Sequence, residues 1–283
     1  MTDLIDAVLD EIVTCALRED LSGGDLTTEA TVSAERRAVA KAVAHSALVL
    51  AGSAAFARTF YLVDRGLRVE SLKQDGERAE AGEALFIVEG PARSILLAER
   101  CALNFLQRLC GVATLTRRFV DALPPGSKTR IADTRKTTPG LRALERLAVR
   151  AGGGHNHRND LGSAVLIKDN HIVAAGGIRV AVERARRHAP HTSRIEVEVD
   201  SLPQFEEALA AGADIVLLDN FSDAAVEQAV TRGRGRALLE VSGGITLERV
   251  ARLAAGGVDV ISVGALTHSA PSADIGLDLE LLG

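Results

Sequence analysis

The chain has 283 residues, of which 47% are hydrophobic and 25% charged, and its formal net charge is -5. This composition is that of a globular protein with a sizeable core, and the length allows one large barrel or two domains. The charge excludes a global basic field of the kind that attracts nucleic acid or an anionic membrane, so anionic substrates would need a local basic pocket.

The first predicted element is an amphipathic helix over residues 3–19, where apolar residues recur at helical spacing. The same segment carries too many acids for a signal or transit peptide. The three cysteines form no CxxC pair, and no apolar run approaches the roughly 18 residues of a membrane span. We therefore expect a cytoplasmic protein with reduced cysteines and no contact with membranes.

A small β-rich domain is predicted next, because short apolar runs between residues 30 and 95 are separated by turns at Asp75-Gly76 and Ala81-Gly82. Residues 95–121 then predict a long buried helix that could break near Gly111. We place the first domain at 1–110, with the N-terminal helix, a small sheet or sandwich and the linking helix.

From residue 129 onward, short β-like runs alternate with helical patterns. The runs are TRIAD (129–133), AVLIKD (164–169), RIEVEV (194–199), DIVLLD (214–219), RALLEV (236–241) and DVISVG (259–264). Repeated β-α units favour a parallel sheet, so we predict an α/β fold with an incomplete TIM-like barrel over 111–270. An open doubly wound sheet is the alternative, although the absence of GxGxxG disfavours a dinucleotide-binding domain. Residues 271–283 are expected to pack back on the first domain.

The polar residues at the strand ends fall into three groups, which matters because barrel sites lie at the carboxyl ends of the strands. The early strands and the GGGHNHR segment supply cations, the middle strands supply acids, and the last two are followed by glycine turns. These groups are Arg135, Lys136, His157, Arg158 and Lys168; Glu198 and Asp219; and Ser242-Gly243-Gly244 and Gly264-Ala265.

Each group indicates a ligand. Backbone N–H groups of glycine turns suit a phosphate, carboxylates beside them suit Mg²⁺ or sugar hydroxyls, and clustered Arg and Lys suit planar carboxylates. The residues alone therefore indicate a phosphorylated sugar, a divalent metal and a polycarboxylate.

Each feature also has a plainer explanation. A single Lys or Arg at a strand end is more often a surface charge, and glycine turns commonly precede helices. Glu196 and Glu198 share one strand face, so one could simply pair with Arg158 or Lys168. The joint pattern is much less expected by chance than any one member. Two rival functions remain: a Schiff-base aldolase or lyase that uses Lys168, and a non-catalytic carboxylate or nucleotide sensor.

At these positions the sequence resembles the quinolinate phosphoribosyltransferases over essentially the whole chain. The matching segments are AERCALNFLQRLCGVAT, DTRKTTPGLRALERLAVRAGGG, NHRNDLG, LIKDNH, EVEVDS, LLDNF, VSGGI, ISVGALTHS, EDLSGGDLTT and DIGLDLE. The resemblance implies an open-sandwich domain before an incomplete barrel, and a homodimer that sometimes assembles further. It also implies a pentosyltransferase that converts quinolinate and phosphoribosyl pyrophosphate, with Mg²⁺, into nicotinate mononucleotide, pyrophosphate and CO₂.

The resemblance also implies roles for individual residues. Arg100 would reach the substrate of a neighbouring subunit, while Glu198 and Asp219 would serve the ribose and Mg²⁺, with Lys136 and Lys168 as further catalytic residues. The quinolinate pocket would use Thr134, Arg135, Lys136, His157, Arg158 and Lys168, and the phosphate site Ser242, Gly243, Gly244, Val263, Gly264 and Ala265. His155 departs from the family pattern, which more often has a small or apolar residue there.

Overall fold

The structure, a computed structural model, describes residues 2–282 and divides into two compact units. The first contains the chain up to Arg117, Thr137–Gly153 and the segment from Thr267 onward, and the second contains Arg118–Lys136 and Gly154–Leu266. The predicted boundaries after residues 110 and 270 differ from this division, because the chain returns to the first unit between residues 137 and 153. In the described part of the chain, no helix combines the length and apolar character needed to span a bilayer.

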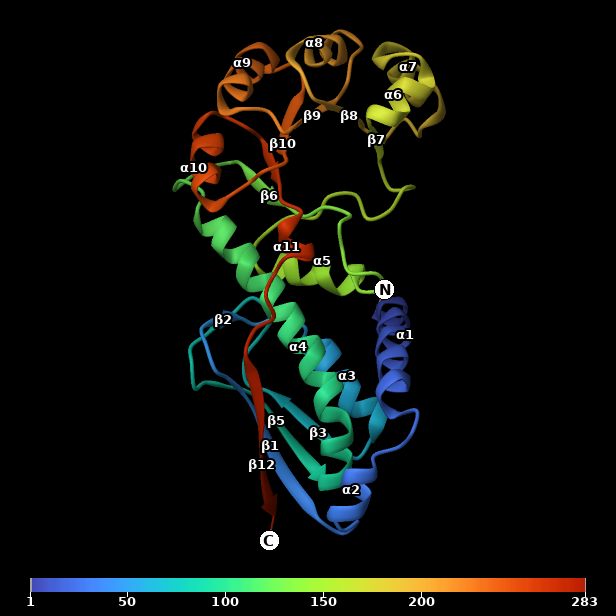
Figure 1. Ribbon diagram of the computed structural model, residues 1–283, viewed down its shortest axis with the longest axis vertical. Coiled ribbons are helices and arrows are strands. Elements are labelled where there is room, and N and C mark those ends of the chain that lie inside the picture. Colours follow the sequence, from blue (N-terminus) through green and yellow to red (C-terminus); the bar gives the residue numbers. More distant parts are fainter. Residues whose placement is uncertain (1, 283) are drawn as a thin grey trace. The chain divides into compact units, whose positions relative to one another are not determined.

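The first unit is built on a four-stranded antiparallel sheet in the order β12-β1-β5-β3, with a small β2-β4 pair beside it (Figure 1). The segment expected to pack back on this domain forms β12, which pairs with β1 along its length. The elements are α1 (Thr2–Leu21), α2 (Leu26–Thr31), β1 (Arg37–Ala44), β2 (Leu48–Val49), α3 (Ser53–Val63), β3 (Arg68–Ser71), β4 (Arg78–Ala79), β5 (Ala84–Pro91), α4 (Ala92–Asp121, which continues into the second unit), α5 (Arg142–Ala151) and β12 (Ile275–Leu282).

Helix α3 was not expected in a segment of β-like texture. Its Phe56 and Phe60 lie four residues apart on one helical face, and their rings pack edge to face with centroids 5.0 Å apart. Both rings are buried, and Phe56 also contacts Phe86 of β5. The helix is therefore defined by the core it fills rather than by its local composition.

Helix α4 runs without interruption from Ala92 to Asp121, so the expected break at Gly111 is wrong. The glycine serves a close contact instead. A Cβ at this position would lie 2.0 Å from the backbone oxygen of Pro271. Any side chain there would push the C-terminal segment away from the helix.

The second unit contains six parallel strands in the order β6-β11-β10-β9-β8-β7. This arrangement confirms the expected α/β fold, and the sheet ends at β6 and β7 rather than closing through eight strands. The helices that follow the strands lie along its outer side (Figure 1). The elements are β6 (Arg130–Ala132), β7 (Val165–Ile167), α6 (Asp169–Ala175), α7 (Ile178–His188), β8 (Ile195–Val199), α8 (Leu202–Ala210), β9 (Ile215–Asp219), α9 (Asp223–Gly233), β10 (Leu238–Ser242), α10 (Leu247–Ala255), β11 (Val260–Ser262) and α11 (Ala265–His268), the last reaching into the first unit.

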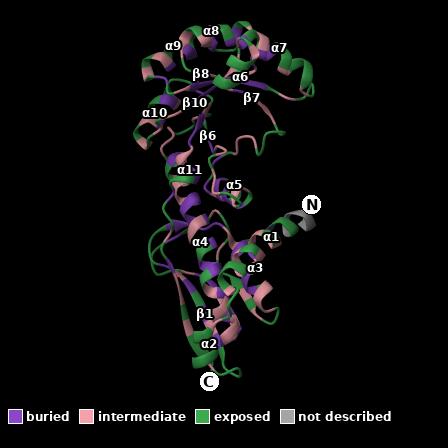
Figure 2. Cartoon of the chain, turned by 45° about the vertical axis from the view of Figure 1, so that its right-hand side comes forward, coloured by how far each residue is buried: buried purple, intermediate pink, exposed green. Residues whose placement is uncertain are grey.

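The strands of this sheet bury their apolar residues against the outer helices and turn polar residues to the other face. In β8, Val197 and Val199 are buried, while Glu196 and Glu198 alternate with them and point to the opposite side. Figure 2 shows mostly buried strands and outer helices with exposed surfaces. The polar side chains of the face that does not pack on the helices are therefore available to form a functional site.

Candidate active site

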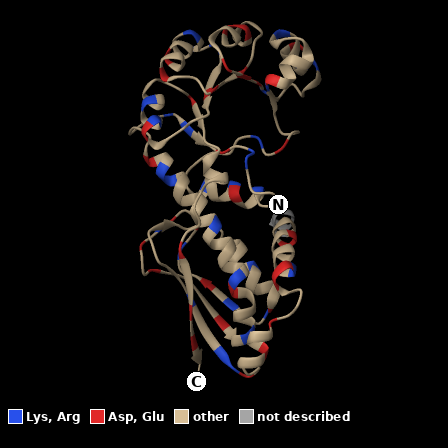
Figure 3. Ribbon diagram, in the orientation of Figure 1, with Lys and Arg blue, Asp and Glu red and all other residues tan. Residues whose placement is uncertain are grey.

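A cavity of about 370 Å³ opens on the polar face of the six-stranded sheet, entirely within the second unit. It is lined by Thr134, Arg135, Lys136, His157, Arg158, Leu166, Lys168, Glu198, Leu217, Asp219, Glu240, Ser242 and Ser262. Figure 3 shows that both basic and acidic residues surround this unit. The structure therefore brings together the predicted cations, both predicted acids and Ser242.

The loop that carries His157 and Arg158 is fixed by a buried carboxylate. Asp133, which directly follows β6, accepts hydrogen bonds from the backbone N of His157 at 2.7 Å and from Asn156 Nδ2 at 2.6 Å. Arg158 Nη1 donates to the backbone oxygen of Ala164 at 3.1 Å. Asp133 after β6 therefore holds the backbone of His157, and Ala164 before β7 holds the side chain of Arg158.

The cationic residues that line the cavity form what is called the cation group: Arg135, Lys136, His157, Arg158 and Lys168. Their electrostatics favour binding of an anion. Burial and the neighbouring charge of Arg135 lower the pKa of Arg158. The Nε of Arg135 is buried and has no hydrogen-bond partner in the described part of the chain. A buried donor without a partner costs free energy of about 1–3 kcal/mol, which a carboxylate ligand would recover.

The two acids lie on neighbouring strands and are partly engaged. Glu198 Oε2 forms an ion pair with Lys168 Nζ. Asp219 Oδ2 accepts a hydrogen bond from Asn220 Nδ2 at 2.9 Å. Lys168 is the residue immediately before α6, and its backbone N donates to His171 Nδ1 at 3.0 Å. One of the two glutamates of β8 is therefore a salt-bridge partner of Lys168, as the shared strand face allowed.

His157, which lines the cavity, also forms a charge cluster with Glu196 and Glu240. His157 Nε2 lies 3.3 Å from Glu196 Oε2 and 3.4 Å from Glu240 Oε1, and Ser262 Oγ donates to Glu240 Oε1. Burial opposes the charge on the imidazole, but its hydrogen bonds to the two carboxylates outweigh burial and raise the pKa of His157 to about 10. Burial also raises the pKa of Glu196. The two carboxylates therefore favour the charged form of His157.

This cluster predicts an unusual titration. The imidazole signal of His157 should titrate near pH 10 in a histidine-labelled NMR experiment, rather than near the ordinary 6.5. Because the folded pKa lies above the unfolded one, the charge stabilises the fold fully below pH 6.5 and progressively less as pH rises to about 10. Glu240→Gln should move the midpoint down, because it removes one of the two carboxylates that favour the charged ring. A wild-type midpoint near 6.5 would contradict the assigned charge.

The predicted phosphate residues occupy two turns. Ser242 ends β10 and lines the cavity, and Gly243 and Gly244 follow it with positive φ of 84° and 57°. Val263 is buried, and its backbone N donates to Ala132 O at 2.9 Å. Gly264 and Ala265 follow at the start of α11. Of this group only Ser242 is among the residues that line the cavity.

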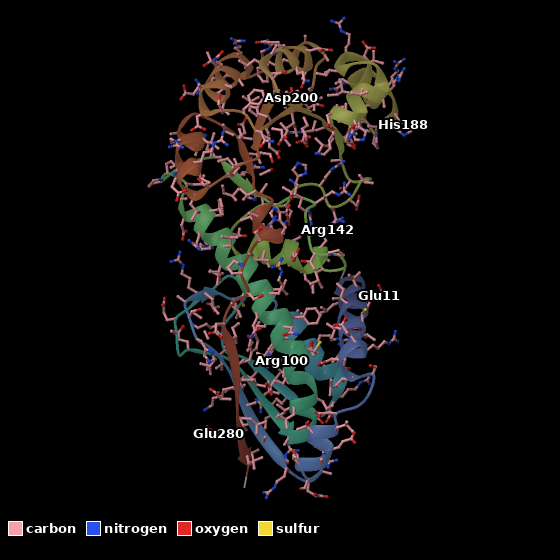
Figure 4. All side chains as sticks on the ribbon, in the orientation of Figure 1. Glu11, Arg100, Arg142, His188, Asp200 and Glu280 are labelled. Atoms are coloured by element: carbon pink, nitrogen blue, oxygen red, sulfur yellow. The ribbon has the colours of Figure 1, made fainter. Side chains whose placement is uncertain are left out.

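Arg100 and His155 do not line the cavity. Arg100 lies on α4 in the first unit, where its side chain is 60% exposed and its Nη2 lies 3.9 Å from Glu99 Oε1 (Figure 4). His155 is exposed and joins β6 through a backbone bridge to Ala132. It is not one of the residues lining the cavity.

Four residues that line the cavity were not among the predicted site residues: Leu166, Leu217, Glu240 and Ser262. A signal for all four was present. Each lies two residues before a predicted site residue in, or directly after, the same predicted β run, namely Lys168, Asp219, Ser242 and Gly264, so the period of two places it on the same face.

The donor set suits a hard divalent cation at the acids. Glu198 and Asp219 offer carboxylate oxygens in one cavity, and Asp219 retains an oxygen that the bond from Asn220 does not use. His157, Glu196 and Glu240 also bring ligand atoms within 4.8 Å of one another. Their atoms are already engaged in the ion pairs and the Ser262 hydrogen bond, so this cluster satisfies itself without a metal.

Comparison with known proteins identifies the family. The model of the quinolinate phosphoribosyl transferase N-terminal domain matches residues 25–110, and that of the C-terminal domain matches residues 112–278. The chain belongs to the quinolinate phosphoribosyl transferase family.

Individual members of the family are similar along nearly their whole length. The nicotinate-nucleotide pyrophosphorylase [carboxylating] of Mycobacterium leprae is 46% identical over 271 residues, covering 93% of this chain and 94% of the relative. The crystal structure of NadC from Streptococcus pyogenes is 42% identical, with a TM-score of 0.92 and 97% of each chain covered. The nicotinate-nucleotide pyrophosphorylase structure from Francisella tularensis is 39% identical, with a TM-score of 0.92 and coverage of 97% and 96%.

Proposed function

We propose that this protein transfers phosphoribosyl from phosphoribosyl pyrophosphate to quinolinate with loss of CO₂, giving nicotinate mononucleotide and pyrophosphate for NAD biosynthesis. The observation that carries the proposal is the cavity itself. It joins a cation group with an unpartnered buried Arg135 Nε to two carboxylates and to Ser242, which the glycine turn follows. Membership of the family and the names of its relatives support the same reaction.

The cation group would bind and orient quinolinate. Arg135, Arg158 and Lys168 line one cavity, where two adjacent carboxylates of a planar ring can each meet a positive charge. His157 adds a further charge, held by the buried acids. Holding the ring nitrogen against the sugar carbon is the main task, because the reaction needs orientation and not a protein nucleophile.

The acids and the glycine turn would act on the sugar. Positive charge develops at the ribose carbon as pyrophosphate leaves, and Glu198 and Asp219 stabilise it and bind the hydroxyls. Glu198 and Asp219 would also hold Mg²⁺, which when bound supplies positive charge against the departing pyrophosphate. Once joined to the sugar, the positively charged pyridinium nitrogen stabilises the electron pair that departing CO₂ leaves on the neighbouring ring carbon. A proton from solvent then completes nicotinate mononucleotide, so the chain needs no nucleophile of its own.

The two rival functions receive less support. Lys168 Nζ is engaged by Glu198, so a Schiff base would first require this ion pair to break. A sensor would not need an acid pair beside a cation group and a glycine turn. Incubation with quinolinate, phosphoribosyl pyrophosphate and Mg²⁺, followed by chromatography for nicotinate mononucleotide, tests the proposal directly. Absence of product from folded protein would refute it.

The setting of the reaction is part of the same proposal. A homodimer, sometimes assembled further, would bring Arg100 to the neighbouring subunit's substrate, which its exposed side chain allows. A cytoplasmic location fits the free cysteines Cys15, Cys101 and Cys110. Sedimentation of the purified protein tests the assembly.

Substrate choice is a direct consequence of the cation group. Quinolinate should exceed nicotinate in kcat/KM by about 10⁴-fold, because nicotinate leaves a cation of the cavity without a carboxylate partner. Arg158→Met should reduce this preference, whereas a matched change of exposed Arg184 on α7 should leave it intact. Steady-state kinetics with both acids provides the measurement, and comparable kcat/KM values would contradict the assignment of the pocket.

A further inference from the structure

The turns that follow β9 and β10 are joined through Asn220. Its backbone N donates to Ser242 O at 3.0 Å, and its Nδ2 donates to Asp219 Oδ2 at 2.9 Å. Asn220 takes a left-handed φ of 56°, a conformation that asparagine adopts more readily than most residues. One residue thereby connects the end of β10 to the carboxylate at the end of β9.

The glycine turn is fitted closely against this asparagine. A Cβ at Gly243 would lie 2.1 Å from Asn220 Oδ1 and 3.0 Å from its backbone N. No side chain can occupy that space, and φ of Gly243 is itself 84°. The position of the turn is thus determined by contact with Asn220.

Arg249 of α10 completes the connection from the other side. Its Nη1 donates to Gly243 O at 3.1 Å, its Nη2 to Phe221 O at 2.5 Å and its Nε to Asp223 Oδ1 at 2.7 Å. The side chain is only 13% exposed. The planar guanidinium reaches all three acceptors at once, a geometry that a lysine ammonium does not reproduce.

We propose that Asn220 and Arg249 are positioning residues that hold Asp219 and the Ser242-Gly243-Gly244 turn in fixed register for a pyrophosphate-bearing sugar. The inference rests on the proposed function and deepens it. Binding such a substrate requires the carboxylate and the backbone donors at a set distance, and a shift of about 1 Å costs on the order of 10²-fold in rate. The hydrogen bonds of these two residues go to the two turns and to Asp223, not to the cation group.

Substitution of these residues should therefore weaken the binding of one substrate and not of the other. In Arg249→Met and Asn220→Gly, the dissociation constant and KM for phosphoribosyl pyrophosphate should rise about tenfold or more, while KM for quinolinate stays within about twofold. Arg249→Lys should fall between these variants and wild type. Asn220→Gly is informative because glycine tolerates the left-handed φ, so weaker binding would not come from a strained backbone.

The matched control is Arg252→Met on the same helix. Arg252 pairs with Asp223 at 3.2 Å but is 67% exposed, and its removal changes the net charge by the same amount. It should leave both KM values near those of wild type. Calorimetric titration of phosphoribosyl pyrophosphate with Mg²⁺ gives the affinity independently of turnover.

Two outcomes would overturn the proposal. One is wild-type affinity for phosphoribosyl pyrophosphate in folded Asn220→Gly and Arg249→Lys. These two variants are sufficient for the test if circular dichroism shows that Arg249→Met does not fold. The other is an equal rise of both KM values, which indicates general loosening of the unit. If wild-type protein forms no nicotinate mononucleotide, the proposed function fails as well. If the wild type is active and the variants keep its affinity for phosphoribosyl pyrophosphate, this inference is wrong and the proposed function stands.

Discussion

Asp219→Asn and Glu198→Gln are each expected to lower kcat by about 10²- to 10³-fold. Both substitutions keep the size of the side chain and remove the negative charge that, in the proposed function, stabilises the ribose carbon. The affinity for phosphoribosyl pyrophosphate should fall in both variants. Quinolinate should bind as well as before, and more tightly in Glu198→Gln, because Lys168 loses its ion-pair partner and is free for a carboxylate.

The comparison needs a matched acid outside the cavity. Asp200 follows β8 directly, is exposed, and is labelled in Figure 4. Asp200→Asn should keep kcat near the wild-type value. Steady-state kinetics with calorimetry for each substrate provides the measurement, with EDTA treatment as a parallel test. Full turnover in EDTA, or in both cavity variants, would show that these acids do not perform the role assigned to them.

Mixing two inactive proteins should restore activity if subunits share sites as proposed. Arg100→Ala and Lys168→Ala homodimers are each expected to be nearly inactive, because every site carries one defect. In the heterodimer one site carries both defects and the other carries neither, since a two-fold interface is reciprocal. Random exchange of equal amounts then gives about a quarter of wild-type activity.

The control pair places both changes in one cavity. Asp219 and Lys168 line the same cavity of the same chain, so mixing Asp219→Asn with Lys168→Ala leaves a defect in every site. No recovery is expected there. Mass spectrometry of the intact complexes verifies exchange. If exchange is complete and the Arg100 mixture also stays inactive, Arg100 does not act across subunits.

The strands of the second unit could be predicted because each is a short apolar run that ends in a polar residue. The residues at those ends could be predicted as a group, because parallel strands bring their carboxyl ends to one edge. The pairing partners of these residues could not be predicted. Glu196 and Glu198 look alike in the sequence, yet one binds His157 in the interior and the other binds Lys168 in the cavity. Depth below the surface, which the strand pattern does not encode, separates them.

The division into units was harder to predict than the elements. The segment that forms α5 follows the TRKTTPG motif, yet it belongs to the first unit. Its Glu145 is fully buried and accepts a hydrogen bond from Arg108 Nη2 of α4 at 2.7 Å. This partner lies far away in the sequence, so no local signal indicates it.

The pairing of β12 with β1 has a consequence for how the chain matures on the ribosome. Strand β1 is made early, but the neighbour that covers one of its edges is the last strand of the chain. Until residues 275–282 emerge, β1 offers that edge, with its unpaired N–H and C=O groups, to any other extended chain. The first unit is thus first in synthesis and last in completion, which leaves nascent chains on neighbouring ribosomes open to mispairing.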